Sequence, residues 1–326
     1  MEWIAWAVGE GFFMGLMKFG QGFVGGQSPT LWHVILATGI VGMIQMTTGF
    51  GVVAAKKKEF HVNEKYLMGS LGLGLAMSGA TFCAFAALRA GADMGANTFI
   101  GNALVIIPAA FIGRWSFRER VGARQWIGVA LGIAGAVFVT VPALGAGGGY
   151  AWIAWSLGTL FCATLMRVIQ KYLAKLGNAG LPPLHPGQML FWGGVSMTLC
   201  MPLGFIGEGV LYAVSASPLL LFAAGVALCN SAWWWCRLRA FQEQAPLAIK
   251  DLPSMPVYLA TASVAGTLWF GDAMGIMKIV GLLMFFPAFF LAQEDAWGYC
   301  AGFFTRCQYR KVWSAEKPSQ RAPAKP

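Results

Sequence analysis

The sequence predicts an all-α integral membrane protein, with ten transmembrane helices forming two inverted five-helix repeats around a central cavity. A composition poor in charge, long apolar runs and an uneven distribution of lysine and arginine support this fold class. Of the 326 residues, 57% are hydrophobic and 11% are charged, whereas soluble domains average about 25% charged residues. Because so few charges cannot cover a water-soluble surface, we expect much of the surface to face lipid.

The apolar runs are as long as membrane-spanning helices. A helix needs about 20 mostly apolar residues to cross the hydrocarbon core, whereas the strands of a membrane barrel alternate over about ten residues. Backbone groups in lipid must pair internally, and continuous apolar runs fit helices. We expect spans near residues 2–22, 31–55, 66–89, 92–113, 124–142, 150–172, 187–207, 217–238, 245–269 and 273–293.

Lysine and arginine are concentrated in every second loop between these spans. The intervening loops carry almost no cations, apart from Arg89 beside a short turn. Positively charged loops stay in the cytoplasm, so we expect both termini there, in a multi-pass protein of a bacterial inner membrane. Membrane orientation then explains the net charge of +10 without nucleic acid as a partner. The loop cations are Lys56, Lys57, Lys58, Lys65, Arg114, Arg118, Arg120, Arg124, Lys171, Lys175, Arg237 and Arg239.

The chain contains an internal repeat. Each half, 1–142 and 150–293, holds five predicted spans, and because five is odd the halves enter the membrane from opposite sides. Such inverted repeats favour alternating access to a site near the midplane. Residues 294–326 follow as a basic cytoplasmic tail that we expect to be partly disordered. Most matching residues are 153 positions apart: Glu119 and Asp272, Gly128 and Gly281, Ala87 and Ala240, Ala92 and Ala245, with Trp6 and Lys18 matching Trp155 and Arg167 at a slightly different offset.

Several short motifs share one family pattern. The stretch 112–135 carries Glu119-Arg120, Gln125-Trp126-Ile127-Gly128 and Gly135, and the second half carries Phe270-Gly271-Asp272 with Gly281. Over residues 3–293 the chain resembles the drug/metabolite transporter superfamily, in particular its EamA-type ten-helix members. The resemblance implies a ten-helix bundle whose third, fourth, eighth and ninth helices line a central cavity. The stretch 31–36 departs from the family pattern because it lacks an arginine.

Charged residues inside predicted spans are candidates for substrate binding or coupling. They are Glu10 and Lys18 in the first span and Lys250 and Asp251 in the ninth. Charge inside a membrane is costly and points to function by default. Glu10 could neutralise a cationic substrate or carry a coupling proton, or it could form a structural pair with Lys18 or Arg89.

Prolines surround the Lys250–Asp251 pair, at Pro246, Pro253 and Pro256. Proline removes a backbone donor and disrupts a helix, and broken helices in membranes usually line a cavity. We therefore expect the pair to bind substrate. The alternative is a lysine that snorkels to the cytoplasmic interface.

Asn97, Asn230 and Trp234 complete the candidate site. Asn97 corresponds to Lys250 under the shift of 153 positions, and Asn230 is an amide within an apolar run. Interhelical hydrogen bonds are the alternative for both amides. Trp234 belongs to a run of three tryptophans, 233–235, of which one could stack on a substrate and another is expected to face lipid.

Other charged and titratable residues are expected to be structural. Arg167, near the cytoplasmic end of the sixth span, is expected to snorkel. Glu119 and Asp272 are expected to support helix starts, where acids are favoured. The three histidines do not pair with other ligands at metal spacing, and no HExxH, GxSxG or phosphate-binding loop occurs. We therefore expect no enzyme activity, no metal and no cofactor.

These features favour a secondary active transporter that exports a small polar or amphipathic metabolite by alternating access. Its expected partners are a small-molecule substrate and the lipid bilayer, with protons as a candidate coupling ion. A membrane scaffold or lipid-handling protein on the same helical bundle is the alternative. An intramembrane enzyme is less favoured because the sequence offers no catalytic constellation.

The predicted topology can be tested with reporter fusions. A reporter that is active only outside the cytoplasm should give no signal when fused after Pro326, because the tail follows a cation-rich cytoplasmic end. The same reporter inserted within 145–148 should give a strong signal. The reverse pattern would contradict the ten-span arrangement.

Overall fold

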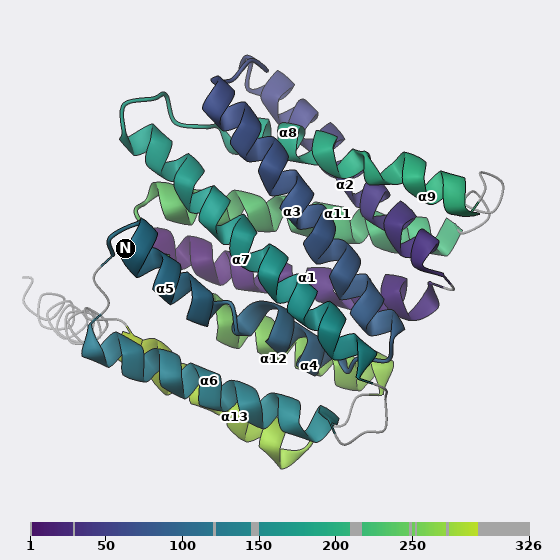
Figure 1. Ribbon diagram of the computed structural model, residues 1–326, viewed down its shortest axis with the longest axis vertical. Coiled ribbons are helices and arrows are strands. Elements are labelled where there is room, and N and C mark those ends of the chain that lie inside the picture. The colour runs from purple at the N-terminus through teal and green to yellow at the C-terminus, as the bar shows by residue number, and fades with distance from the viewer. Residues whose placement is uncertain are drawn as a thin grey trace, which may run out of the picture.

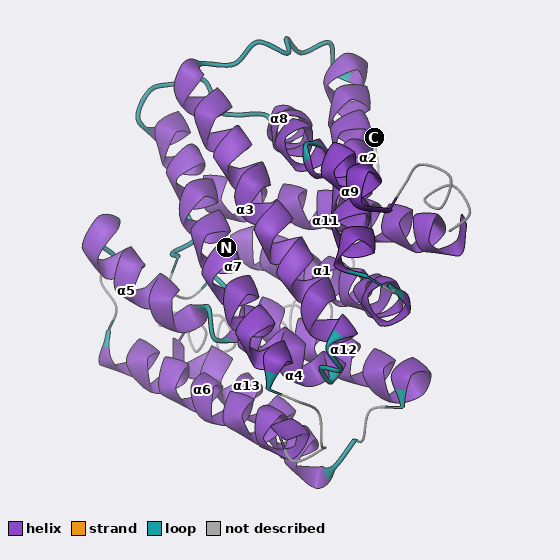
Figure 2. Ribbon diagram, turned by 45° about the vertical axis from the view of Figure 1, so that its right-hand side comes forward, coloured by secondary structure: helices purple, strands orange, loops and turns teal. Residues whose placement is uncertain are grey.

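The computed structural model describes residues 2–28, 30–119, 122–144, 150–208, 217–247, 250–251, 253–271 and 274–292. No strand occurs among them, and Figure 2 shows helices joined by loops. The prediction of an all-α protein is therefore confirmed for this part of the chain. Asp272 and the tail 294–326 lie outside it. The helices are α1 (Glu2–Gln27), α2 (Leu31–Ala55), α3 (Glu64–Arg89), α4 (Met94–Thr98), the π-helix η1 (Phe99–Ala103), α5 (Ile106–Ser116), α6 (Ala123–Leu144), α7 (Ala151–Asn178), α8 (Pro186–Thr198), α9 (Cys200–Glu208), α11 (Ser217–Gln242), α12 (Ser254–Phe270) and α13 (Ile276–Ala292).

Local sequence explains several helix ends. Thr30, Asn63 and Asp93 precede α2, α3 and α4, and each side chain accepts a hydrogen bond from a backbone amide of the first turn. His185 caps α8 in the same way. Such caps satisfy amides that have no partner within the helix. α12 ends at Gly271, whose φ of 73° lies in the left-handed region that favours glycine.

The structure has the helices of a membrane-embedded protein. Large apolar side chains are exposed along them, including Phe161 and Ile276, each 71% exposed. Extensive exposed apolar surface is unusual in a water-soluble monomer and suits contact with lipid. The number of ten spans stays a prediction. Five stretches are long and apolar enough to cross a membrane: Leu31–Ala55, Glu64–Arg89, Met94–Ser116, Ala151–Gly177 and Pro186–Gly207.

Four helix pairs form much of the bundle. α1 packs against α11, α3 against α7, α2 against α8, and α6 against α13. α1 also contacts α12, and α7 also contacts η1. In Figure 1 the α6–α13 pair lies along one edge of the bundle and α2, α8 and α9 lie toward the opposite edge. α1, α3, α7 and α11 therefore occupy the middle, where any central site must be built.

The predicted fourth span, residues 92–113, is not one continuous α-helix. It consists of α4, the π-helix η1 and α5 in succession. The hydrogen bonds of a π-helix join residues five apart, and short π-helical turns are frequent at functional sites. The break therefore makes this part of the bundle a candidate for a functional site.

The helix of the predicted ninth span, 245–269, begins only at Ser254. Lys250 and Asp251 lie in the non-helical segment before it. This corrects the expectation that the pair lies within the helix of the ninth span. The expected interruption by prolines is found, and Pro253 directly precedes the first helical residue.

α2 and α8 approach so closely that their contact requires glycine. A Cβ atom on Gly42 would lie 2.7 Å from the carbonyl carbon of Met197, and one on Gly194 would lie 2.7 Å from the Cα atom of Met46. Small residues allow membrane helices to approach at this distance. The α2–α8 contact continues through Gly49, and Gly39 and Gly204 bring α2 equally close to α9.

This close packing predicts that alanine substitution at two glycines of α2 has very different effects on stability. Gly42→Ala should lower stability by about 1–3 kcal/mol, because the added methyl group meets backbone atoms that cannot move aside. Gly51→Ala is the matched control, since a Cβ atom there meets nothing within 4 Å and alanine is the better helix former. Thermal unfolding of the purified protein in detergent measures both. Equal unfolding temperatures for the two variants would contradict the observed approach of α2 to α8.

Candidate functional site

Five charged side chains meet in the interior of the bundle. Glu10 belongs to α1, Arg167 to α7 and Arg237 to α11, while Lys250 and Asp251 precede α12. Each is at most 1% exposed. We call these five residues the charge cluster. It joins four separate parts of the chain.

Three side chains donate hydrogen bonds to Glu10. Its Oε1 accepts hydrogen bonds from Nε of Arg237 at 2.8 Å, from Nη2 of Arg237 at 2.5 Å, and from the Trp233 indole at 3.2 Å. Its Oε2 accepts one from Nζ of Lys250 at 2.5 Å. The Arg237 guanidinium also lies over the Trp233 ring, 4.3 Å from its centroid, in a cation–π contact. Both carboxylate oxygens of Glu10 therefore accept hydrogen bonds from other side chains.

Asp251 joins the second arginine to the cluster. Its Oδ2 lies 2.5 Å from Nε of Arg167, and its Oδ1 lies 2.7 Å from Nζ of Lys250. Nη2 of Arg167 donates a hydrogen bond to the carbonyl oxygen of Asn102, in η1, at 3.3 Å. Lys250 therefore bridges both carboxylates, and Arg167 connects the cluster to the π-helical break.

Burying these charges is costly. Even after relaxation, each ion taken out of water costs several kcal/mol, and buried pairs can often be replaced by apolar side chains without loss of stability. Packing alone therefore does not explain why the chain carries five charges here. A buried charge cluster at two interrupted helices is, in a membrane-embedded protein, a candidate for ligand binding.

Lys18 lies on α1, about two helical turns from Glu10. It is 1% exposed and, among the described residues, pairs with no carboxylate or hydrogen-bond acceptor. It lines a cavity of about 20 Å³ together with Asn102 and Trp233, which contact the cluster; that volume has room for about one water molecule. Glu10 therefore pairs with neither Lys18 nor Arg89, and the latter donates to a backbone carbonyl between α1 and α2.

The two predicted asparagines lie outside the charge cluster. Oδ1 of Asn97 accepts a hydrogen bond from the Ser156 hydroxyl at 2.9 Å. Nδ2 of Asn230 donates to Oε1 of Gln45 at 2.6 Å. Both amides therefore make interhelical hydrogen bonds, which were the predicted alternative to substrate binding.

The three tryptophans of α11 have different surroundings. Trp234 is fully buried and packs against Gly193. Trp235 is partly exposed and meets the His185 ring edge-on, with centroids 5.5 Å apart. The ring that reaches the charge cluster is Trp233, and not Trp234 as the sequence suggested.

Sequence reasoning missed both arginines of the cluster. The prediction that Arg167 snorkels is wrong, because its side chain is 0% exposed and pairs with Asp251. The assignment of Arg237 to a cytoplasmic loop is wrong, because α11 continues to Gln242 and buries it. For Arg167 the repeat offered a signal, since it matches Lys18 in the first half.

A pocket of about 340 Å³ opens beside the charge cluster, and its lining includes Lys171, Lys175 and Phe241. The Phe241 ring centroid lies 5.5 Å from Nζ of Lys171 and 5.2 Å from Nζ of Lys250. One aromatic ring therefore contacts both a cation of the pocket and a cation of the cluster.

Glu119, also in the lining of this pocket, has a structural role. Its two carboxylate oxygens accept hydrogen bonds from the Leu247 amide at 2.9 and 3.0 Å. Oε1 also lies 3.3 Å from Nζ of Lys171. The sequence predicted support for a helix start; the structure shows that Glu119 holds the non-helical segment before α12.

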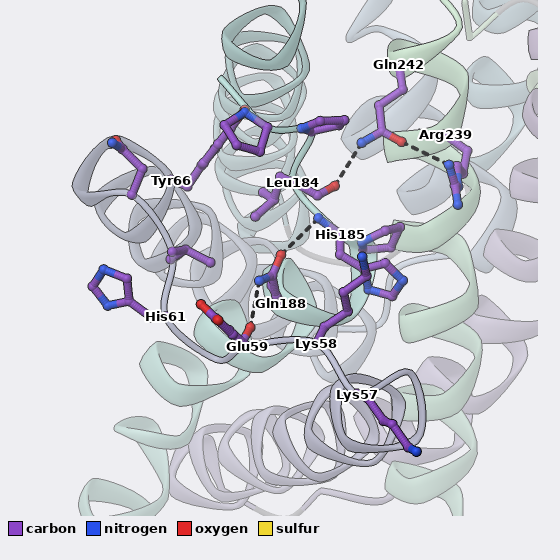
Figure 3. A pocket seen from close by; sticks show the side chains of 15 residues that line it. Lys57, Lys58, Glu59, His61, Tyr66, Leu184, His185, Gln188, Arg239 and Gln242 are labelled. Carbon is purple, nitrogen blue, oxygen red and sulfur yellow. Dashed lines mark hydrogen bonds between the residues drawn. The ribbon is translucent and has the colours of Figure 1, made fainter. Parts of the chain in front are cut away.

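Another pocket, of about 640 Å³, is lined by the loop 56–63, the segment before α8 and the end of α11. Figure 3 shows Gln188 beside two of these segments, where its side chain donates to the Glu59 carbonyl at 2.7 Å and accepts from the His185 amide at 3.0 Å. Burial and the nearby charge of Arg239 lower the pKa of the His185 imidazole. No residue of the charge cluster lines this pocket.

The fold and the site define a helical membrane protein with a buried charge cluster. No family model and no curated protein matches the chain. A solved structure described only as "Crystal structure of protein" is similar over 88% of this chain and 96% of its own, with 16% sequence identity and a TM-score of 0.62. At that identity the likeness concerns the fold alone. Within the described ranges, no group of three His, Cys, Asp or Glu side chains could hold a metal ion.

The buried pairs of Glu10 predict a large cost for its neutralisation. Glu10→Gln should lower the free energy of unfolding by about 3–5 kcal/mol, because two buried cations lose a shared carboxylate. Glu64→Gln is the control, since Glu64 is exposed in the first turn of α3, and exposed charges contribute about 1 kcal/mol or less. Chemical unfolding in detergent measures the two values. Similar small losses would show that the cluster does not depend on the charge of Glu10.

Proposed function

We propose that the protein is a secondary active transporter that exports a small polar or amphipathic metabolite by alternating access. We further propose that it is an EamA-type member of the drug/metabolite transporter superfamily. The observation that carries the proposal is the charge cluster, in which α1, α7, α11 and the segment before α12 meet. Charges inside a membrane protein usually face a ligand or water pathway in at least one state.

The packing of helices supports an inverted repeat. If α1 corresponds to α7 and α3 to α11, then the α1–α11 contact is equivalent to the α7–α3 contact. The α2–α8 and α6–α13 contacts each join elements that correspond to one another. The contact of α1 with α12 likewise matches that of α7 with the interrupted fourth segment. This agreement is expected of two halves related by a pseudo-two-fold axis.

The interruptions also support two related halves. Lys250 lies 153 positions after Asn97, so the non-helical segment before α12 corresponds to the part of the fourth segment where α4 passes into η1. Transporters built from inverted repeats often bind substrate at such discontinuous helices near the midplane. The charge cluster contacts both breaks, through Lys250 and through the bond of Arg167 to Asn102.

The charge cluster is closed in this structure, because all its side chains are at most 1% exposed and the cavity between it and Lys18 measures about 20 Å³. Alternating access would open it to each side in turn. Phe241 is a candidate gate residue, since its ring contacts Lys250 and also lines the 340 Å³ pocket. The sequence has no motif for ATP hydrolysis, so an ion or substrate gradient would drive transport, with protons as one candidate.

A transport assay tests the proposal. A thermal-stability screen first identifies compounds that bind the purified protein, because ligands stabilise by mass action. Proteoliposomes should then accumulate a stabilising compound, with and without a pH gradient to reveal proton coupling. Lys250→Ala should reduce uptake at least tenfold while the exposed control Lys65→Ala leaves it unchanged. The proposal fails if no stabilising compound is carried, or if Lys250→Ala transports normally.

A further inference from the structure

The interior of the bundle holds more positive than negative charge. Glu10 and Asp251 are the carboxylates at most 1% exposed among the described residues. Each already lies within 2.7 Å of two cationic side chains. Four basic side chains are buried to the same extent, Lys18, Arg167, Arg237 and Lys250. When all four are protonated, the surplus is two positive charges.

We propose that this surplus is the recognition site for an anion, and that the substrate is a small oxyanion bearing a carboxylate or phosphate group. The inference rests on the proposed transport function only for the way a ligand reaches the site. Uncompensated charge in a low-dielectric interior is costly. A ligand with one or two negative charges removes that cost when it binds, so the site favours anions over neutral or cationic molecules.

The cations also have unused donors. Nη1 of Arg167 and Nη1 of Arg237 are buried and have no hydrogen-bond partner, and Lys18 has no paired acceptor among the described residues. Guanidinium groups suit carboxylate and phosphate because their N–H groups match the spacing of two oxygens. The carboxylate oxygens of Asp251 also lack a hydrogen bond, but each lies within 2.7 Å of a cationic side chain. A cationic substrate would therefore have to displace a lysine or an arginine.

The neighbouring pocket has the same sign of charge. Lys171 and Lys175 line it, and its acid, Glu119, is already bound to Lys171 and to a backbone amide. A pocket lined by charges of one sign attracts ligands of the opposite sign. Phe241 then connects this pocket to Lys250. The membrane potential, negative inside, would drive an anion outward, in agreement with export.

Thermal stability with chosen probes tests the anion site in the full-length protein. The anionic probes are succinate and inorganic phosphate, which separate a carboxylate from a phosphate ligand. Succinamide and 1,4-diaminobutane are the neutral and cationic comparisons, all at fixed ionic strength. At least one anion should raise Tm by about 4 °C at saturation, and the comparisons should not.

The Lys18→Met variant distinguishes an effect of the surplus charge from an effect of packing. Because Lys18 lacks a counter-ion, this variant should unfold at a higher temperature than the wild type without ligand, and it should bind the anion at least tenfold more weakly. Lys250→Met should weaken the anion effect similarly. Lys278→Met is the control, since it removes a buried lysine that has its own carboxylate partner, Asp93, and it should keep the full anion effect.

Three results would overturn the inference: no shift with either anion, the same shift in wild type, Lys18→Met and Lys250→Met, or a lower Tm for ligand-free Lys18→Met than for the wild type. If a neutral or cationic compound is transported and anions are not, the anion inference fails and the transport proposal stands. If an anion binds but is not carried into proteoliposomes, the transport proposal fails and the anion site stands.

Discussion

The interior of this bundle depends on Glu10, a buried carboxylate held between Arg237 and Lys250. A single carboxylate there links α1 to α11 and to the segment before α12. Because isolated buried charges are so costly, these elements must remain close together whenever the cluster is dry. Any motion that separates them must let water or a ligand replace the lost partners. The same contact that stabilises the closed bundle therefore limits the ways in which the bundle can open.

The sequence predicted the helical class and part of the site, for identifiable reasons. Charge in an apolar run stands out, so Glu10, Lys250 and Asp251 were found, and the prolines around the last two indicated the break before α12. Arg167 and Arg237 were missed because a cation near a helix end is usually a snorkelling side chain. Their partners depend on which helices pack together, and that is a non-local property of the fold.

The break in the fourth span shows a second limit of sequence reasoning. No proline lies in η1, residues Phe99–Ala103, so this break lacks the signal that marks the break before α12. The reason for its location lies in its contacts, since the Asn102 carbonyl accepts a hydrogen bond from Arg167 and the Asn102 amide donates to the Tyr258 hydroxyl at 3.0 Å. The break therefore positions backbone and side-chain groups beside the charge cluster, as expected for a site built between two halves.

Access to Lys250 from the two sides of the membrane is the most direct test of the account. Lys250→Cys, made in a variant without the native cysteines, can be treated with a hydrophilic thiol reagent from either side of oriented vesicles. Alternating access predicts that the thiol reacts with reagent from both sides and that substrate slows the reaction. Conditions that speed the reaction from one side should slow it from the other. A thiol that is inert from both sides would contradict the account, because the charge cluster would then be a permanently packed contact.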